Sequence, residues 1–349
     1  MSSSEPHDVF WALAARYDDP HQVPSLPEIL KLLVTEREAA ILLSLPGTEQ
    51  EVQCKAGEDP PFVRATLQKC FRNGMVLRTP QEHDDPRYAF GESYMSTIAN
   101  DERNNALGAD YKELWHRWTT EDRARSVPAA ASDVPSARII PIPEMVQDRD
   151  TILPLEDAVA IVEASRRRVA VQCPCRYRTG ACDYQVEEIC LLLNDLADDY
   201  AERGSGRELS REEALALLRR ASESGLVHVA SGEYHTSAPL GAEVICNCCP
   251  CCCAVLRPYL LSGRKPKLGT NYYAEVDAGL CVGCARCEDR CHFGAIRVDE
   301  GTAVVDRSEC VGCGLCAYTC EQESITLKRI EGPAYVPLHA EPHYLIPKG

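Results

Sequence analysis

Two cysteine runs near the end of this 349-residue chain share one spacing, C-x2-C-x2-C-x3-C. This is the ligand spacing of a cubane iron–sulfur cluster, in which the fourth cysteine of each run binds the cluster of the other run. The spacing therefore predicts two [4Fe–4S] clusters. One cluster is assigned to Cys281, Cys284, Cys287 and Cys320, and the other to Cys310, Cys313, Cys316 and Cys291.

The segment around these cysteines is an internal repeat. Ala274-Glu-Val-Asp recurs as Ala303-Val-Val-Asp, and Cys281 recurs 29 residues later as Cys310. A repeat of this length that contains all the ligands predicts two copies of one small unit. Each copy is expected to contain a strand, a cysteine loop, one helical turn and a second strand, and a pseudo-two-fold axis should relate the copies.

With these features, residues 271–330 resemble a bacterial two-cluster ferredoxin. The resemblance implies a small module that carries low-potential electrons. It departs from the family pattern at His292 and Glu321, which stand where those ferredoxins carry proline after the fourth cysteine. Zinc is the alternative metal, because C-x2-C pairs also bind zinc.

Ten further cysteines lie between residues 173 and 253, and six of them fall within residues 246–253. Six cysteines in eight residues cannot all face inward on a regular element, so this run predicts a metal-binding loop. The count fits one or two further cubane clusters, or one cluster and a reactive or zinc site. The predicted ligands are Cys173, Cys175, Cys182, Cys190, Cys246, Cys248, Cys249, Cys251, Cys252 and Cys253.

The strands expected in this middle segment suggest how its cysteines meet. Residues 169–172 and 244–245 are each expected to form a strand that ends in a cysteine loop. Pairing of the two strands would bring Cys173 and Cys246 to the same sheet edge, where one cluster could bind both. The other expected elements are helices over 155–164, over about 186–203 and from the capping box at Ser210 to near Gly225, and a strand over 226–229.

The N-terminal part of the chain is expected to contain a winged-helix-like domain. Thr35-x-x-Glu38 and Thr48-x-x-Glu51 are capping boxes, and Asp59 before two prolines begins a third helix. A β-ribbon should follow. Such modules often bind DNA, but this one lacks the positive charge that phosphate contacts require. The third helix offers only Arg64, Lys69 and Arg72, and the ribbon tip carries Glu82, Asp84 and Asp85.

These features predict a multidomain α+β protein. The expected order is an N-terminal extension (1–25), a winged-helix-like domain with one further helix (26–126), a Pro/Ala-rich linker (127–154), a cysteine-rich α/β domain (155–270), the two-cluster ferredoxin-like domain (271–330) and a tail (331–349).

Composition indicates the compartment in which this chain works and the partners it can bind. The N-terminus has neither a basic start nor an apolar stretch, so twenty cysteines favour a reducing cytoplasm over disulfides. We expect no membrane span, because no apolar run of about 18 residues occurs. A net charge of −16 argues against nucleic-acid binding and favours a protein partner with a basic surface.

The order of these parts is similar to a group of iron–sulfur proteins common in anaerobes and described only as 4Fe–4S binding proteins. The resemblance implies an iron–sulfur electron-transfer protein, either a carrier or a relay subunit that serves a redox partner. One alternative is a reductase with a catalytic cluster among the middle cysteines. A second is an iron–sulfur redox sensor that regulates transcription. No catalytic residue is predicted.

Overall fold

The computed structural model describes residues 8–17, 24–79, 86–90, 98–99, 101–119, 138–231, 242–254, 256–257 and 270–330. The chain forms two compact units. The first unit comprises residues 1–130, 171–181 and 199–206, and the second comprises residues 131–170, 182–198 and 207–349. The expected mixture of helices and sheets is confirmed. No helix in the described ranges is both long and apolar enough to cross a membrane.

The first unit contains helices whose beginnings follow the predicted capping signals. Both capping boxes are formed, at Thr35 and at Thr48, and the Asp59 carboxylate caps the next helix by accepting from the Phe62 amide. The helices of this unit are α1 (Val9–Arg16), α2 (Ser25–Leu33), α3 (Glu36–Leu42), α4 (Glu49–Ala56), α5 (Pro60–Arg72), α7 (Ala109–Arg117) and α10 (Pro174–Thr179).

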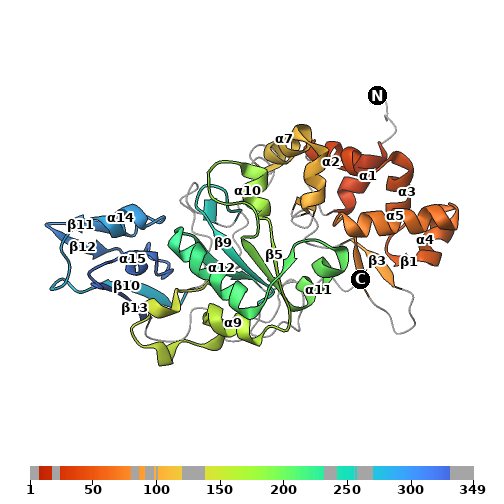
Figure 1. Cartoon of the computed structure of the whole chain (residues 1–349). Coiled ribbons are helices and arrows are strands. Elements are labelled where there is room, and N and C mark those ends of the chain that lie inside the picture. Colours follow the sequence, from red (N-terminus) through yellow and green to blue (C-terminus); the bar gives the residue numbers. More distant parts are fainter. Residues whose placement is uncertain are drawn as a thin grey trace. The chain divides into compact units, whose positions relative to one another are not determined.

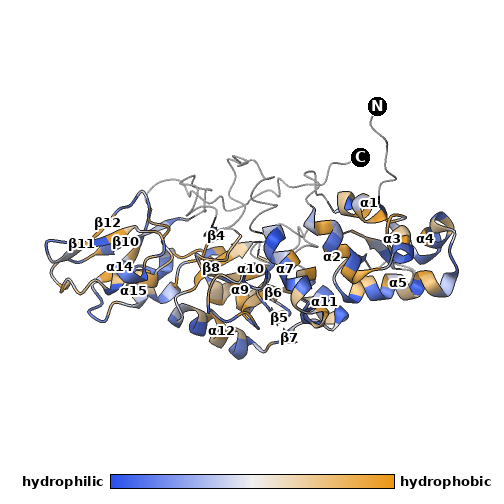
Figure 2. Cartoon of the chain, turned by 90° about the horizontal axis from the view of Figure 1, so that it is seen from above, coloured by the Kyte–Doolittle hydropathy of each residue, from blue (hydrophilic) through white to orange (hydrophobic). Residues whose placement is uncertain are grey.

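Helix α5 (Pro60–Arg72) supplies an apolar face to this unit. Val63, Leu67, Cys70 and Phe71 are all buried, and Figure 2 shows hydrophobic and hydrophilic residues alternating along this helix. A three-stranded sheet of order β1-β3-β2 completes the segment, with β1 (Gly47–Thr48), β2 (Leu77–Thr79) and β3 (Arg87–Ala89). The predicted acidic tip with Glu82, Asp84 and Asp85 lies outside the described residues.

The second unit is built around a six-stranded sheet of order β4-β8-β9-β6-β5-β7. Helices α9 (Ala158–Ala164) and α12 (Arg211–Glu223) bury their apolar sides against one face of it (Figure 1). α12 begins at the predicted capping box of Ser210. The strands are β4 (Arg138–Ile139), β5 (Arg168–Val171), β6 (Cys190–Leu193), β7 (Arg207–Glu208), β8 (Val227–Ser231) and β9 (Val244–Cys248).

Strand β6 corrects two predictions. The helix expected over about 186–203 is wrong for residues 190–193, which form this strand, and α11 (Asn194–Arg203) begins only after it. All four strand residues are buried, and a short apolar run of this kind fits a buried strand as well as a helix. β6 also lies between β5 and β9, so the direct pairing expected for those two strands does not occur.

The described part of the predicted Pro/Ala-rich linker, residues 138–154, is packed rather than extended into solvent. Ile140 is fully buried and its amide donates to the His228 carbonyl of β8 over 3.0 Å. A few residues later, the Ile142 amide donates to the Cys313 carbonyl over 3.1 Å. The segment therefore joins the sheet to the C-terminal repeat by backbone hydrogen bonds. Residues 127–137 lie outside the described part.

The C-terminal repeat has the predicted pseudo-symmetry. The first strand of one half pairs with the last strand of the other, since β10 (Tyr272–Val276) is antiparallel to β13 (Ile325–Arg329). The two inner strands, β11 (Ile296–Asp299) and β12 (Thr302–Val305), form an antiparallel hairpin. One short helix follows each cysteine loop, α14 (Arg286–Arg290) in the first half and α15 (Leu315–Tyr318) in the second.

His292, one of the two departures from the ferredoxin pattern, anchors the repeat to α12. Its Nε2 lies 2.7 Å from the carbonyl oxygen of Gly225, just after the end of that helix. Arg290 donates to the carbonyls of Ser222 at 3.1 Å and Glu223 at 2.6 Å. A cation at these last carbonyls also offsets the negative end of the helix dipole.

A buried carboxylate, Glu156, fixes the other side of the repeat. Its oxygens accept hydrogen bonds from the Tyr272 hydroxyl at 2.8 Å, from Arg329 at 2.7 Å and from the Asn271 amide. Burial by itself raises the pKa of Glu156, but these hydrogen bonds outweigh burial and hold the pKa below its ordinary value of 4.5. The ionised carboxylate therefore stabilises the fold.

Replacing Glu156 with glutamine should lower stability near pH 7 by about 2 kcal/mol, because hydrogen bonds to a charged acceptor are lost. A depressed folded-state pKa contributes stability above the unfolded value, and this contribution disappears as pH falls below 4.5 through the folded value. The difference in thermal midpoint between wild type and E156Q should therefore be largest near neutrality and shrink in acid. A difference that stays constant from pH 7 to pH 4 would contradict this role.

Candidate metal centres

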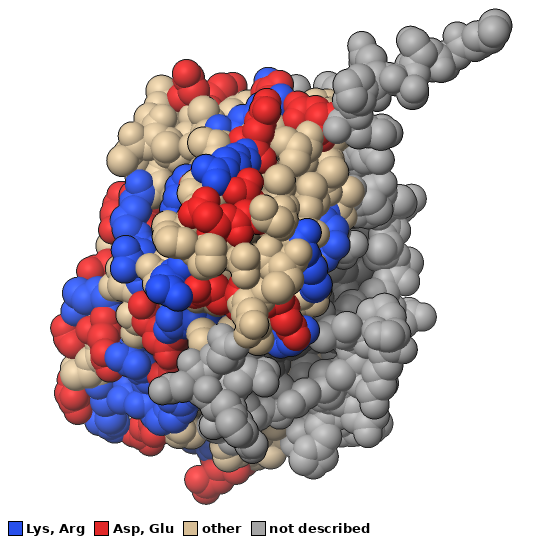
Figure 3. Space-filling model, turned by 90° about the vertical axis from the view of Figure 1, so that its right-hand side faces the viewer, with Lys and Arg blue, Asp and Glu red and all other residues tan. Residues whose placement is uncertain are grey.

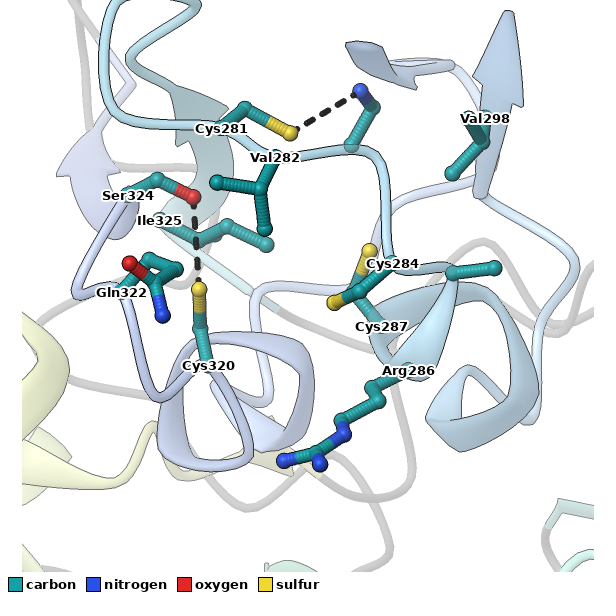
Figure 4. A pocket seen from close by; sticks show the side chains of 12 residues that line it. Cys281, Val282, Cys284, Arg286, Cys287, Val298, Cys320, Gln322, Ser324 and Ile325 are labelled. Carbon is teal, nitrogen blue, oxygen red and sulfur yellow. Dashed lines mark hydrogen bonds between the residues drawn. The ribbon is translucent and has the colours of Figure 1, made fainter. Parts of the chain in front are cut away.

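The first cavity of the C-terminal repeat, here called the outer cavity, is lined by Cys281, Cys284, Cys287 and Cys320. Its empty space, including the part open to solvent, is about 330 Å³. Figure 4 shows these side chains, three of them from the first cysteine loop and Cys320 from the second half of the repeat. The set is the one assigned to a single cluster from the spacing. Cys284 is exposed, so this cavity lies at the protein surface.

The second cavity, here called the inner cavity, is lined by the complementary set, Cys310, Cys313, Cys316 and Cys291. Its empty space, including the part open to solvent, is about 370 Å³. Burial raises the pKa of Cys313 to about 12 and also raises that of Cys316. Thiolates at such buried positions need a neighbouring cation, which bound iron supplies.

Two glycines allow the cysteine loops to approach the strands of the repeat. Gly283 has φ +66°, and a Cβ there would lie 2.4 Å from the carbonyl oxygen of Gly301. Its counterpart Gly312 has φ +63°, and a Cβ there would lie 2.4 Å from the carbonyl oxygen of Tyr272. Only glycine fits both the positive φ and the close approach.

Backbone amides point at the sulfur atoms in a pattern that follows the repeat. The Ala303 amide donates to Cys281 Sγ over 3.4 Å, and the equivalent Ala274 amide donates to Cys310 Sγ over 3.3 Å. Such N–H···S hydrogen bonds stabilise thiolates and tune the potential of iron–sulfur clusters. The donor sets, their spacing around a cavity and these amides all fit [4Fe–4S] clusters.

Ser324 breaks this symmetry at the outer cavity. The amide of Ala295 lies 3.3 Å from Cys291 Sγ, whereas Cys320 lies 3.2 Å from the Ser324 hydroxyl. Burial raises the pKa of Cys320, but hydrogen bonds from the hydroxyl and amide of Ser324 and from the amides of Gln322 and Ile325 together lower the pKa below its ordinary value. The sequence analysis did not single out Ser324 as a functional residue. Alignment of the two halves was the available signal, because it pairs Ser324 with Ala295.

A third group of thiols forms where the middle cysteines meet. The sulfurs of Cys182, Cys249, Cys251 and Cys252 all lie within 4.8 Å of one another. Cys182 is 3.4 Å from Cys252 and 3.8 Å from Cys249. Burial raises the pKa of Cys251 to about 12, and hydrogen bonding with Cys182 and Cys249 adds to the rise. Four thiols at these distances form a ready set of metal ligands.

Three further thiols lie on the opposite face of the sheet from α9 and α12. Cys246 and Cys248 alternate along β9 and therefore share one face, where Cys253 joins them. Cys248 is buried and hydrogen-bonded to both of the other thiols. These hydrogen bonds and the burial both raise the pKa of Cys248. The same apolar cluster contains Val311 and Leu315 and has Cys291, Cys310 and Cys313 packed against it. Cys246, Cys248 and Cys253 thus adjoin the inner cavity.

Three predicted ligands remain, Cys173, Cys175 and Cys190. Cys173 caps α10 and Cys175 lies in its first turn, both in the first unit. Cys190 is buried on the central strand β6. Arg178, which lies near the cysteine motifs, packs over the rings of Trp115 at 5.7 Å and Trp118 at 5.2 Å. Its guanidinium also lies 3.9 Å from the Sγ of Cys175, so Arg178 contacts a predicted ligand as well as the two rings.

Comparison with known proteins agrees with the geometry of the repeat. Residues 303–326 match the family model of the 4Fe–4S binding domain, Fer4. No curated protein and no solved structure matches the chain. The matched segment includes the second cysteine run, most of β12 and the first two residues of β13. The chain therefore contains a C-terminal ferredoxin-like 4Fe–4S binding module and is an iron–sulfur protein.

The Ser324 hydroxyl should raise the reduction potential of a cluster in the outer cavity, because a hydrogen bond to a ligand sulfur favours the reduced, more negative state. Ser324→Ala should lower that potential by about 20–60 mV, the equivalent of one hydrogen bond in a one-electron couple. The measurement is an EPR-monitored redox titration of the holoprotein.

Ala295→Ser provides the matched experiment, since it adds a hydroxyl at the equivalent position of the inner cavity. It should raise the potential of the inner cluster and leave the outer cluster unchanged. If both substitutions shift the same cluster, or neither shifts any, Ser324 has no part in setting the potential.

Proposed function

We propose that this chain is an electron-transfer protein, a carrier or relay subunit, whose C-terminal module exchanges electrons with a redox partner. The observation that carries the proposal is the pair of cavities, each lined by three thiols of one run and the fourth thiol of the other. When bound there, [4Fe–4S] clusters supply one-electron redox chemistry. With these interleaved ligands, two bound clusters would lie next to each other within one repeat.

The outer cavity is the proposed entry or exit point. Beside Cys281 and Cys284, the apolar side chains of Leu280 and Val282 are 53% and 65% exposed. Exposed apolar residues next to a redox centre suit a partner that docks transiently. Glu288 and Asp289 of this module carry negative charge, in keeping with a basic partner surface.

The inner cavity leads toward the sheet of the second unit. We propose that Cys246, Cys248 and Cys253 contribute to one further cluster there, since they pack in the same apolar cluster as the inner-cavity ligands. The residues between are apolar, which excludes water from the path. A third centre at this position would extend the electron path from the outer cavity into the middle of the chain.

The N-terminal elements are proposed to form a winged-helix-like module that serves in docking or support. α3, β1, α4, α5, β2 and β3 follow one another in the order of such a module. Two of the three basic side chains of α5 are engaged within the protein, because Arg64 pairs with Glu49 at 2.8 Å and Lys69 pairs with Glu38 at 2.8 Å. On the face that Figure 3 shows, basic and acidic residues are interspersed.

This module should not bind duplex DNA at physiological salt. Affinity for DNA depends on several uncompensated Lys and Arg contacts with phosphates, and these basic residues already face carboxylates. An electrophoretic mobility shift with the holoprotein and a random-sequence duplex pool should show no complex. Selection of a specific sequence from that pool would favour the redox-sensing regulator.

The crossover of ligands can be tested by combining substitutions. Cys320→Ala should cost about four irons, the content of one cluster. Adding Cys284→Ala should cost no more iron, because both cysteines line the outer cavity. Adding Cys313→Ala instead should bring the loss to about eight irons, since a second cluster is then affected.

The control is Cys54→Ala, which removes an exposed cysteine of α4 and should leave the iron content unchanged. The reverse pattern, in which Cys320→Ala is additive with Cys284→Ala and not with Cys313→Ala, would show that each run binds its own cluster. It would contradict the ligand assignment while leaving the iron–sulfur character of the module intact.

A further inference from the structure

The thiols of Cys182, Cys249, Cys251 and Cys252 lie much closer together than those of a cubane site. A cubane places a cube of irons and sulfides between its thiolates, and the outer and inner cavities provide this room. Among the described residues, these four sulfurs all lie within 4.8 Å of one another, whereas neither set of four ferredoxin sulfurs is grouped so closely. The separation of the sulfurs therefore distinguishes this site from the two cluster cavities.

The observed distances match a single tetrahedral ion. A zinc–thiolate bond of about 2.3 Å in tetrahedral geometry sets neighbouring sulfurs about 3.8 Å apart. The Cys182–Cys249 distance is 3.8 Å and the Cys182–Cys252 distance is 3.4 Å. Four cysteine ligands and no open position are typical of structural zinc sites.

The burial of the four ligands fits a closed site that an ion can still reach. Cys249 and Cys252 are 1% and 2% exposed, whereas Cys182 and Cys251 are partly exposed. The two buried thiols can be deprotonated only if a cation lies beside them, and the two outer thiols leave a path from solvent.

The position of the site explains what an ion would do there. Cys182 belongs to residues 180–189, which contain no helix or strand, whereas Cys249, Cys251 and Cys252 follow the end of β9. An ion bound by all four would tie this loop to the sheet across a sequence separation of 67 residues. Closing a long loop in this way stabilises the folded state.

We propose that Cys182, Cys249, Cys251 and Cys252 hold one tetrahedrally coordinated metal ion, zinc, in a structural site that takes no part in electron transfer. The site is separate from the centres of the proposed electron path. A single iron ion without sulfide would have the same ligand geometry, and metal analysis distinguishes the two.

The test measures zinc, iron and sulfide per chain in the anaerobically purified full-length protein. Zinc-edge X-ray absorption should show a shell of sulfur at about 2.3 Å with no iron neighbour. Cys182→Ala should lose about one zinc and keep its iron and sulfide. Cys182→His should regain the zinc, because imidazole can replace one thiolate at such a site.

Cys54→Ala is again the control and should retain the zinc. One iron without sulfide at the site would support a single-ion centre and identify iron as the ion. Loss of about four irons and four sulfides from Cys182→Ala would overturn the proposal, because it would place a cubane there. A wild-type protein with no metal beyond the ferredoxin clusters would also overturn it. X-ray absorption of the wild type decides the question even if the variants fail to fold, and neither result depends on the proposed electron-transfer function.

Discussion

This structure depends on one constraint, that many cysteine thiols gather at buried positions. Burial alone raises the pKa of cysteines such as Cys313, so without a cation the thiols stay neutral and make only weak hydrogen bonds. Metal binding reverses that preference, because a coordinated thiol is deprotonated outright. The loops of the C-terminal repeat and the turn after β9 carry the thiols that line the two cavities and form the four-sulfur group. Their conformation and the metal content of the protein are therefore expected to be coupled.

The spacing between sulfur atoms assigns different roles to chemically identical ligands. Where four thiols surround a cavity, as in the C-terminal repeat, there is room for a cluster between them. Where four thiols lie within 4.8 Å, only a single ion fits between them. The thiols on β9 adjoin the inner cavity, whereas Cys182 and its partners lie around the turn that follows. β9 ends at Cys248, within the cysteine-rich run 246–253, so the cysteines of this one run are divided between two sites.

Local signals in the sequence predicted much of this arrangement, and long-range packing decided the rest. The capping boxes at Thr35, Thr48 and Ser210 begin helices as expected, since capping depends on residues three positions apart. The cysteine spacing and its repeat predicted sets that the structure places around two cavities. Strand β6 was missed because an apolar run of four residues does not reveal whether it lies between two other strands. The division of the middle cysteines between sites depends on sheet order, which no local pattern contains.

Mössbauer spectroscopy of the full-length protein, grown on ⁵⁷Fe and purified without oxygen, tests the central claim most directly. The account predicts that nearly all the iron gives the spectrum of [4Fe–4S] clusters, with sulfide equal to iron and at least about eight irons per chain. Reduction with dithionite should then convert the clusters of the C-terminal module to a paramagnetic state. A protein whose cysteine sites contain zinc alone, with no sulfide and no iron signal, would contradict the account.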